Sequence, residues 1–132
     1  MAHGREILRA VLLGAALLAP VACKSTTRTG KSYTLTVDRR LEALLSADLR
    51  RAHETALSVV REDYGYVVSR HVADAREGII EAVTARGNAV KVETFRDGDY
   101  ITRVRIFVGP LGDEAAMREM LNQIETRLKE RR

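Results

Sequence analysis

The second half of the chain alternates short β-rich runs with short turn segments, and this pattern restricts the fold more than any other feature of the sequence. The runs are Tyr66–Val72, Ile79–Ala85, Ala89–Phe95 and Tyr100–Val108. Gly, Asn and Asp recur in the segments between them, as is typical of turns. Connections this short join antiparallel neighbours, because parallel neighbours need a long crossover. The pattern therefore predicts an antiparallel meander.

Helical periodicity marks two further segments. Apolar residues recur every three or four positions in Ala47–Tyr64, and Gly65 suits the end of a helix. A second apolar stripe follows Asp113, a good N-cap, and consists of Met117, Met120, Leu121, Ile124 and Leu128. Neither helix can bury its stripe alone, so we expect both to cover one face of the sheet.

Ahead of the first helix, apolar and polar residues alternate between Tyr33 and Leu45. This period predicts one strand, bent near Asp38. The expected fold is therefore α+β, in two layers: an antiparallel β-sheet with two helices on one face, in the order β-α-β-β-β-β-α.

The turns fix an expected register for the last strands. A loop at Asp97–Asp99 sets Val92 opposite Val104, which pairs β-branched residues on the core face. A turn at Gly87-Asn88 places Val83 on the same core face. The residues then expected on the open face include Ile80, Lys91, Phe95, Ile101, Arg103, Arg105 and Phe107. An apolar patch ringed by charge can mark a partner site, and ordinary scatter of apolar residues is the alternative explanation.

The first 22 residues have the pattern of a secretory signal peptide. Arg5 and Arg9 give a basic start, and Ala10–Ala19 is an unbroken apolar run. The run is too short for a spanning helix, which needs about 20 apolar residues. We expect residues 1–22 to be a signal peptide, residues 23–32 a solvated tether, and residues 33–132 a single α+β domain.

Cys23, the only cysteine, stands where the signal ends. Together with Val21 and Ala22 it resembles the end of a bacterial lipoprotein signal, although Pro20 stands where Leu is usual. The resemblance implies that the sulfur of Cys23 carries diacylglycerol, which makes membrane lipid the first expected partner. Ordinary cleavage to a secreted form and an uncleaved anchor are the alternatives.

Composition and motifs argue against two classes of function, nucleic-acid binding and metal-dependent catalysis. The chain has 22 Lys+Arg against 18 Asp+Glu, a balance unlike that of a nucleic-acid-binding protein. His53-Glu54 begins like a zinc-protease helix, but Leu57 stands where the second His is needed. We therefore expect no catalytic residue, no metal site and no cofactor.

The run Val104–Glu114, with Gly109, Pro110 and Gly112 ahead of a helix, resembles a family of small bacterial lipoproteins of unknown function, the domain of unknown function 3568 type. Gly78–Ala82 and the strand leading into the first helix add to the resemblance. It implies an uncharacterised bacterial protein, lipid-anchored in the cell envelope and facing the periplasm. Lys24 after the cysteine resembles the pattern that sorts lipoproteins to the outer rather than the inner membrane. The resemblance brings no activity.

The sequence is compatible with three functions. The first is a non-catalytic binding or assembly module that meets an envelope protein through the open sheet face. The second is a small-ligand carrier with a pocket between helices and sheet, which Met117 and Met120 could line. The third is a hydrolase whose Ser, His and carboxylate groups meet only in space.

Overall fold

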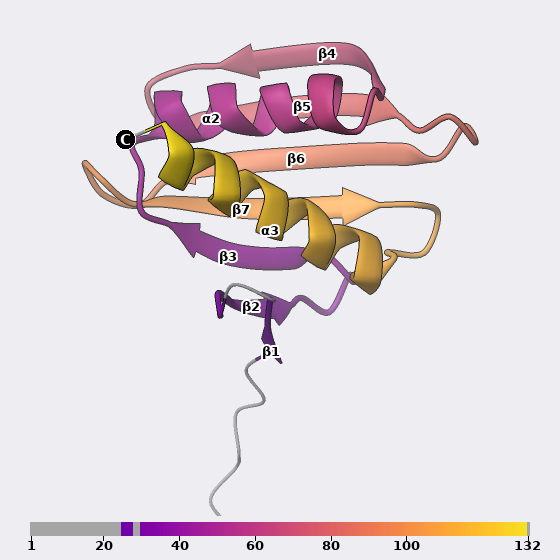
Figure 1. Ribbon diagram of the computed structural model, residues 1–132, viewed down its shortest axis with the longest axis horizontal. Coiled ribbons are helices and arrows are strands. Elements are labelled where there is room, and N and C mark those ends of the chain that lie inside the picture. The colour runs from indigo at the N-terminus through magenta and orange to yellow at the C-terminus, as the bar shows by residue number, and fades with distance from the viewer. Residues whose placement is uncertain (1–24, 28–29, 132) are drawn as a thin grey trace, which may run out of the picture.

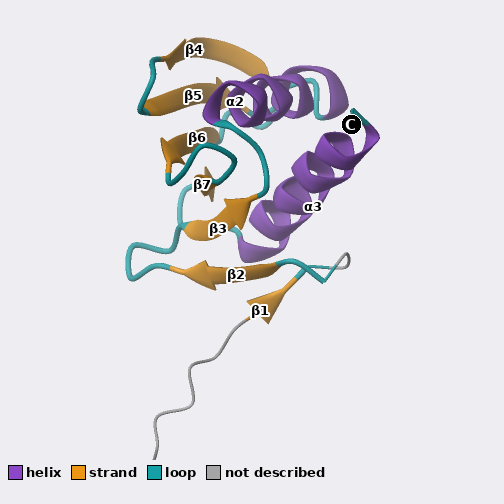
Figure 2. Ribbon diagram, turned by 90° about the vertical axis from the view of Figure 1, so that its left-hand side faces the viewer, coloured by secondary structure: helices purple, strands orange, loops and turns teal. Residues whose placement is uncertain are grey.

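The computed structural model describes residues 25–27 and 30–131. Within these residues the chain forms a seven-stranded antiparallel sheet in the order β1-β2-β3-β7-β6-β5-β4. The strands are β1 (Ser25–Thr26), β2 (Ser32–Leu35), β3 (Leu41–Leu45), β4 (Val67–Ala73), β5 (Glu77–Val83), β6 (Ala89–Arg96) and β7 (Thr102–Val108). Two helices, α2 (Leu49–Ser58) and α3 (Glu114–Glu130), lie on the same face of the sheet (Figures 1 and 2). The α+β fold with an antiparallel sheet is confirmed.

Capping residues start both helices. The Asp48 carboxylate accepts a hydrogen bond from the Arg51 amide (2.9 Å), and the Asp113 carboxylate accepts one from the Ala116 amide (3.1 Å). The first helix continues beyond α2 as a π-helical turn, Val59–Asp63, before Gly65 takes the left-handed conformation. Expected helix starts and stops therefore agree with the structure to within a few residues.

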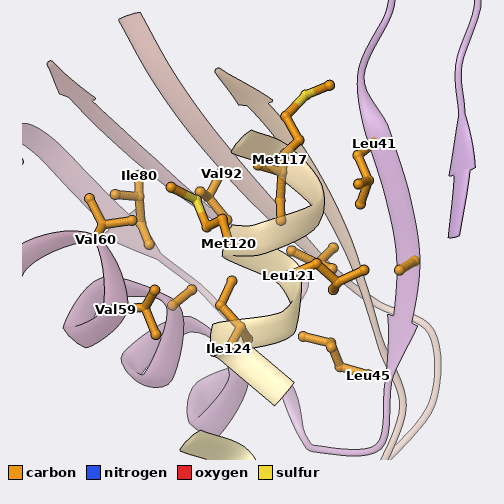
Figure 3. Packing of buried hydrophobic residues seen from close by; sticks show 14 of the residues in the cluster. Leu41, Leu45, Val59, Val60, Ile80, Val92, Met117, Met120, Leu121 and Ile124 are labelled. Atoms are coloured by element: carbon orange, nitrogen blue, oxygen red, sulfur yellow. The ribbon is translucent and has the colours of Figure 1, made fainter. Parts of the chain in front are cut away.

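The core lies between the helices and the sheet, as Figure 3 shows. The apolar stripe of α3 is fully or almost fully buried there, including both methionines. It packs with Val59 and Val60 from the first helix and with Leu41, Leu45 and Val92 from the sheet. Burial of each such side chain stabilises the fold by roughly 1.5–3 kcal/mol.

Between β6 and β7 the loop is one residue later than expected. The Asp97 and Gly98 amides both donate to the Ile101 carbonyl (3.0 Å each), which closes the turn around residues 98–100. Val92 consequently pairs with Ile106, not with Val104. This changes the register by two residues, so each side chain keeps its predicted face.

Between β5 and β6 the expected register is wrong, and the error reverses the faces. The Thr84 amide donates to the Asn88 carbonyl (2.9 Å), and the turn occupies residues 85–87 with Gly87 left-handed. Val83 therefore pairs with Ala89 and is 38% exposed, whereas Ile80 is 0% exposed in the core. A shift by an odd number of residues moves a whole strand's side chains to the opposite face.

The expected single bent strand is also wrong, because Leu35 and Leu41 pair across a tight turn as parts of two strands, β2 and β3. β3 then pairs with β7, so the N-terminal strands extend the meander at its β7 side (Figure 1).

The segment expected to be a solvated tether, residues 23–32, contains in its described residues the strand β1 and the first residue of β2, which form a hairpin. Ser25 pairs with Tyr33, and Thr26 pairs with Ser32. Thr27 is buried. The folded domain thus begins earlier in the sequence than residue 33.

Candidate functional site: the open face of the sheet

One face of the sheet carries no helix from the described part of the chain (Figure 2). We call it the open face, and it comprises Glu42 and Leu44 of β3, Arg103, Arg105 and Phe107 of β7, Lys91, Glu93 and Phe95 of β6, and Ile79 and Glu81 of β5. Along β7 these positions are half-buried and alternate with fully buried ones that face the helices. The strand period therefore builds the face directly from the sequence.

Two arginines and one aromatic ring form its centre. Phe95 pairs directly with Arg103 across the β6–β7 ladder. The guanidinium carbons of Arg103 and Arg105 lie 4.9 Å and 5.1 Å from the centroid of the Phe95 ring. Such cation–π contacts contribute about 0.5–1 kcal/mol each at exposed sites. They hold two long cationic side chains flat against a rigid sheet.

Carboxylates neutralise much of this charge. Glu42 lies beside Arg105, with Oε2 3.2 Å from Nη2, and its Oε1 lies 3.6 Å from Nη1 of Arg103. Arg40 pairs with Glu93 at 2.6 Å. Arg103 Nε is buried and has no hydrogen-bond partner among the described residues. The cluster is therefore an ion-pair network in which one buried donor, Arg103 Nε, has no partner among the described residues.

Two hollows flank the cluster. One, of about 430 Å³, opens where β2 diverges from β3 and is lined in part by Ser32, Thr34, Leu44 and Arg103. The other, of about 200 Å³, reaches Phe95 from the β4–β5 end. A partner that lay on the open face would have a recess on either side of the arginines.

The residues predicted for this face divide as follows. Lys91, Phe95, Arg103, Arg105 and Phe107 all lie on it. Ile101 is 46% exposed in the loop just before β7. Ile80 was wrongly placed, because the odd register shift turns it into the core.

Sequence reasoning missed Glu42 and Ile79. Glu42 pairs with Arg105, but the neighbour of β3 in the sheet could not be read from local pattern. Ile79 was missed through the same register error that misplaced Ile80. Cys23, the predicted lipidation site, lies outside the described residues.

On the helix side of the sheet, a small buried polar group surrounds Gly78. His53 Nδ1 and Thr94 Oγ1 are buried and have no hydrogen-bond partner within the described ranges of the chain. A Cβ on Gly78 would lie 2.6 Å from each of these atoms. Burial lowers the pKa of His53, and nearby His71 lowers it further. His53 is therefore a neutral side chain packed against a strand at neutral pH.

Metal-ligating and membrane-spanning features were sought in the same described part of the chain. It contains no group of three or more His, Cys, Asp or Glu residues placed to hold a metal ion. None of its helices combines the length and the apolar character needed to cross a bilayer.

The family model described as "Protein of unknown function (DUF3568)" matches residues 6–127, which is most of the chain. The chain therefore belongs to this family. No curated protein matches it.

Proposed function

We propose that this member of the DUF3568 family is a lipid-anchored, non-catalytic binding or assembly module of the bacterial envelope, with the open face as its partner site. The observation that carries the proposal is the Arg103–Phe95–Arg105 stack on uncovered, rigid strands. Arginine and aromatic side chains are enriched at the energetic centres of protein interfaces. Here the contacts with the Phe95 ring order both arginines before a partner binds, which lowers the entropy cost of binding.

The partner expected on this face is an envelope protein that presents carboxylates around an apolar centre. Phe95 and Phe107 supply apolar area, and the guanidinium edges supply fixed donors. A guanidinium stays protonated at any physiological pH, so these arginines can bind an anion but cannot exchange protons. This supports recognition over acid–base chemistry.

The anchor is proposed from the sequence. Residues 1–22 are the signal peptide, and Cys23 carries the acyl chains that hold the protein in the membrane, outer rather than inner, facing the periplasm. Acyl chains at one site give stable attachment only when two or more are present, which diacylglycerol provides. The family match begins at residue 6 and spans Cys23, which supports treating this segment as part of what the family shares.

Crosslinking in cells tests the binding proposal. A photo-crosslinking amino acid at Phe107 should capture one defined envelope protein, identified by mass spectrometry. Arg103→Glu and Arg105→Glu together should reduce that product about tenfold or more, because two buried charge contacts would become repulsive. Arg118→Glu, on the exposed surface of α3, is the matched control and should leave the yield unchanged.

Thermal unfolding of the double variant separates lost binding from lost folding. Undiminished crosslinking by a folded double variant would contradict the open face as the partner site. Equal loss in the Arg118→Glu control would contradict it as well.

A small-ligand carrier is the second candidate, and the hollow of about 430 Å³ favours it. That hollow lies beside β2 and β3 on the sheet edge, whereas Met117 and Met120, the residues suggested to line a carrier pocket, are packed in the core. Leu44→Trp would fill the hollow. Loss of a co-purifying small molecule in this variant, measured by native mass spectrometry, would support a carrier.

A further inference from the structure

We propose that the domain docks on the bilayer through a tip made of the β2–β3 turn and the β7–α3 loop, which fixes the sheet's orientation on the membrane. The occupant of this surface is the headgroup and upper acyl region of a phospholipid leaflet. The inference rests on the proposed acylation of Cys23 and adds a second, protein-borne contact to it.

The first step is the short distance between anchor and fold. Cys23 precedes Ser25 by two residues, which span at most about 7 Å when extended. Ser25 already pairs with Tyr33 in the sheet. An acylated Cys23 therefore keeps the β1–β2 edge within one or two residue lengths of the lipid surface.

The second step is that this edge is fastened to the rest of the domain. The Tyr33 hydroxyl donates to Glu114 at the start of α3 (3.0 Å). The Lys31 ammonium lies 3.0 Å from Glu125, whose side chain is almost fully buried. The N-terminal hairpin is thus bound to α3 at two points and is part of the folded domain.

The third step is the apolar tip next to that edge. Val37 is fully exposed (105%) in the β2–β3 turn, and Leu111 is 78% exposed in the β7–α3 loop. The turn is closed by the Thr36 amide donating to the Arg40 carbonyl (2.8 Å), so Val37 makes no contribution to the core. An apolar, β-branched residue is unusual at such a tip, because turns favour Gly, Asn, Asp and Pro.

The two loops are in direct contact with each other. A Cβ on Gly112 would lie 2.5 Å from the Arg39 carbonyl oxygen, so the two backbones are in close contact. The Arg39 guanidinium also donates to the Gly112 carbonyl (3.4 Å). Val37 and Leu111 therefore lie on neighbouring loops with an exposed arginine between them. The exposed carboxylates of Asp38 and Asp113 flank the same two loops, so the attraction of this tip for a bilayer comes from its apolar side chains and not from a net positive charge.

The orientation follows from these contacts. In Figure 1 the N-terminal hairpin forms one edge of the sheet and β4 the opposite edge. With the β1–β2 edge toward the membrane, β4 is the strand farthest from the membrane. The open face is then roughly perpendicular to the plane of the bilayer. A partner in the periplasm could then reach Arg103 and Arg105 without meeting lipid.

Tryptophan is the depth probe, because the chain contains no Trp. Val37→Trp places the probe at the tip, and Val67→Trp places it on β4, where the native valine is also exposed (72%). The acylated protein, purified from membranes, is reconstituted into phosphatidylethanolamine–phosphatidylglycerol vesicles with brominated acyl chains. Emission of the Val37→Trp variant should shift to the blue and fall about twofold, while the Val67→Trp variant stays unchanged.

Equal emission changes in the two variants, or none in either, would overturn the docking proposal. A bare thiol at Cys23 by mass spectrometry would instead overturn the proposed anchor. In that case the protein is attached through Cys23, its only cysteine, to a maleimide headgroup lipid in the same vesicles. The same comparison of Val37→Trp with Val67→Trp then decides the docking proposal without native acylation.

Discussion

Gly112 offers the sharpest test of how the β7–α3 loop is held. Its φ is +78°, and a Cβ there would lie 2.5 Å from the Arg39 carbonyl oxygen and 2.9 Å from the Arg39 Cβ. Gly87 is a matched control, because its φ is +83° and a Cβ there would meet nothing within 4 Å. Alanine at either position has the same strain from a left-handed backbone. Only Gly112→Ala adds a steric clash, between its Cβ and Arg39.

The two costs can be estimated separately. Left-handed backbone costs an L-residue about 1–2 kcal/mol, so Gly87→Ala should lower the free energy of unfolding by roughly that amount. Overpacking against an immobile backbone adds about 1–3 kcal/mol, which brings Gly112→Ala to about 2–5 kcal/mol. For a domain of this size 1 kcal/mol lowers Tm by about 4–8 °C.

Urea unfolding followed by far-ultraviolet circular dichroism measures both variants against the native sequence. The m-values should be equal in all three proteins, because the surface exposed on unfolding does not change. Destabilisation of Gly112→Ala and Gly87→Ala by the same amount, within about 0.5 kcal/mol, would refute the close contact between Gly112 and Arg39.

Four further substitutions test register and charge by the same unfolding assay. Ile80→Ala should cost about 2–5 kcal/mol and Val83→Ala less than about 1 kcal/mol, and the reverse order would contradict the observed β5–β6 register. Because burial lowers the pKa of His53, the unfolded chain binds its proton more tightly. Stability should therefore fall as pH drops below about 6.5, and His53→Gln should lessen that slope. The hydrogen bond from Arg127 lowers the pKa of Asp63. The small cost of Asp63→Asn, up to about 1 kcal/mol, should therefore be present at pH 7 and absent well below pH 4.

The open-face residues show which side-chain directions the sequence pattern predicts correctly and which it does not. Arg103 and Phe95 were placed on the correct face, because a loop displaced by one residue changes the register by two and preserves side-chain direction. Ile80 was placed on the wrong face, because the observed turn before β6 shifts the β5–β6 register by an odd number of residues from the expected one. That shift follows from the turn that Thr84 and Asn88 close, through the Thr84 amide to the Asn88 carbonyl and the Gly87 amide to the Thr84 carbonyl, and composition does not reveal which residues close it.

The sequence by itself determined the two helices, the Asp113 helix cap, the helix end at Gly65 and the last four strands, since each follows from contacts within a few residues along the chain. Only the tertiary structure decided that β3 pairs with β7, where Glu42 meets Arg105 across 63 residues of sequence. It also decided that the N-terminal hairpin is fastened to α3 through Tyr33 and Lys31. The free energy of these pairings comes from surfaces that exist only once distant segments have packed together, so no local window of residues contains it.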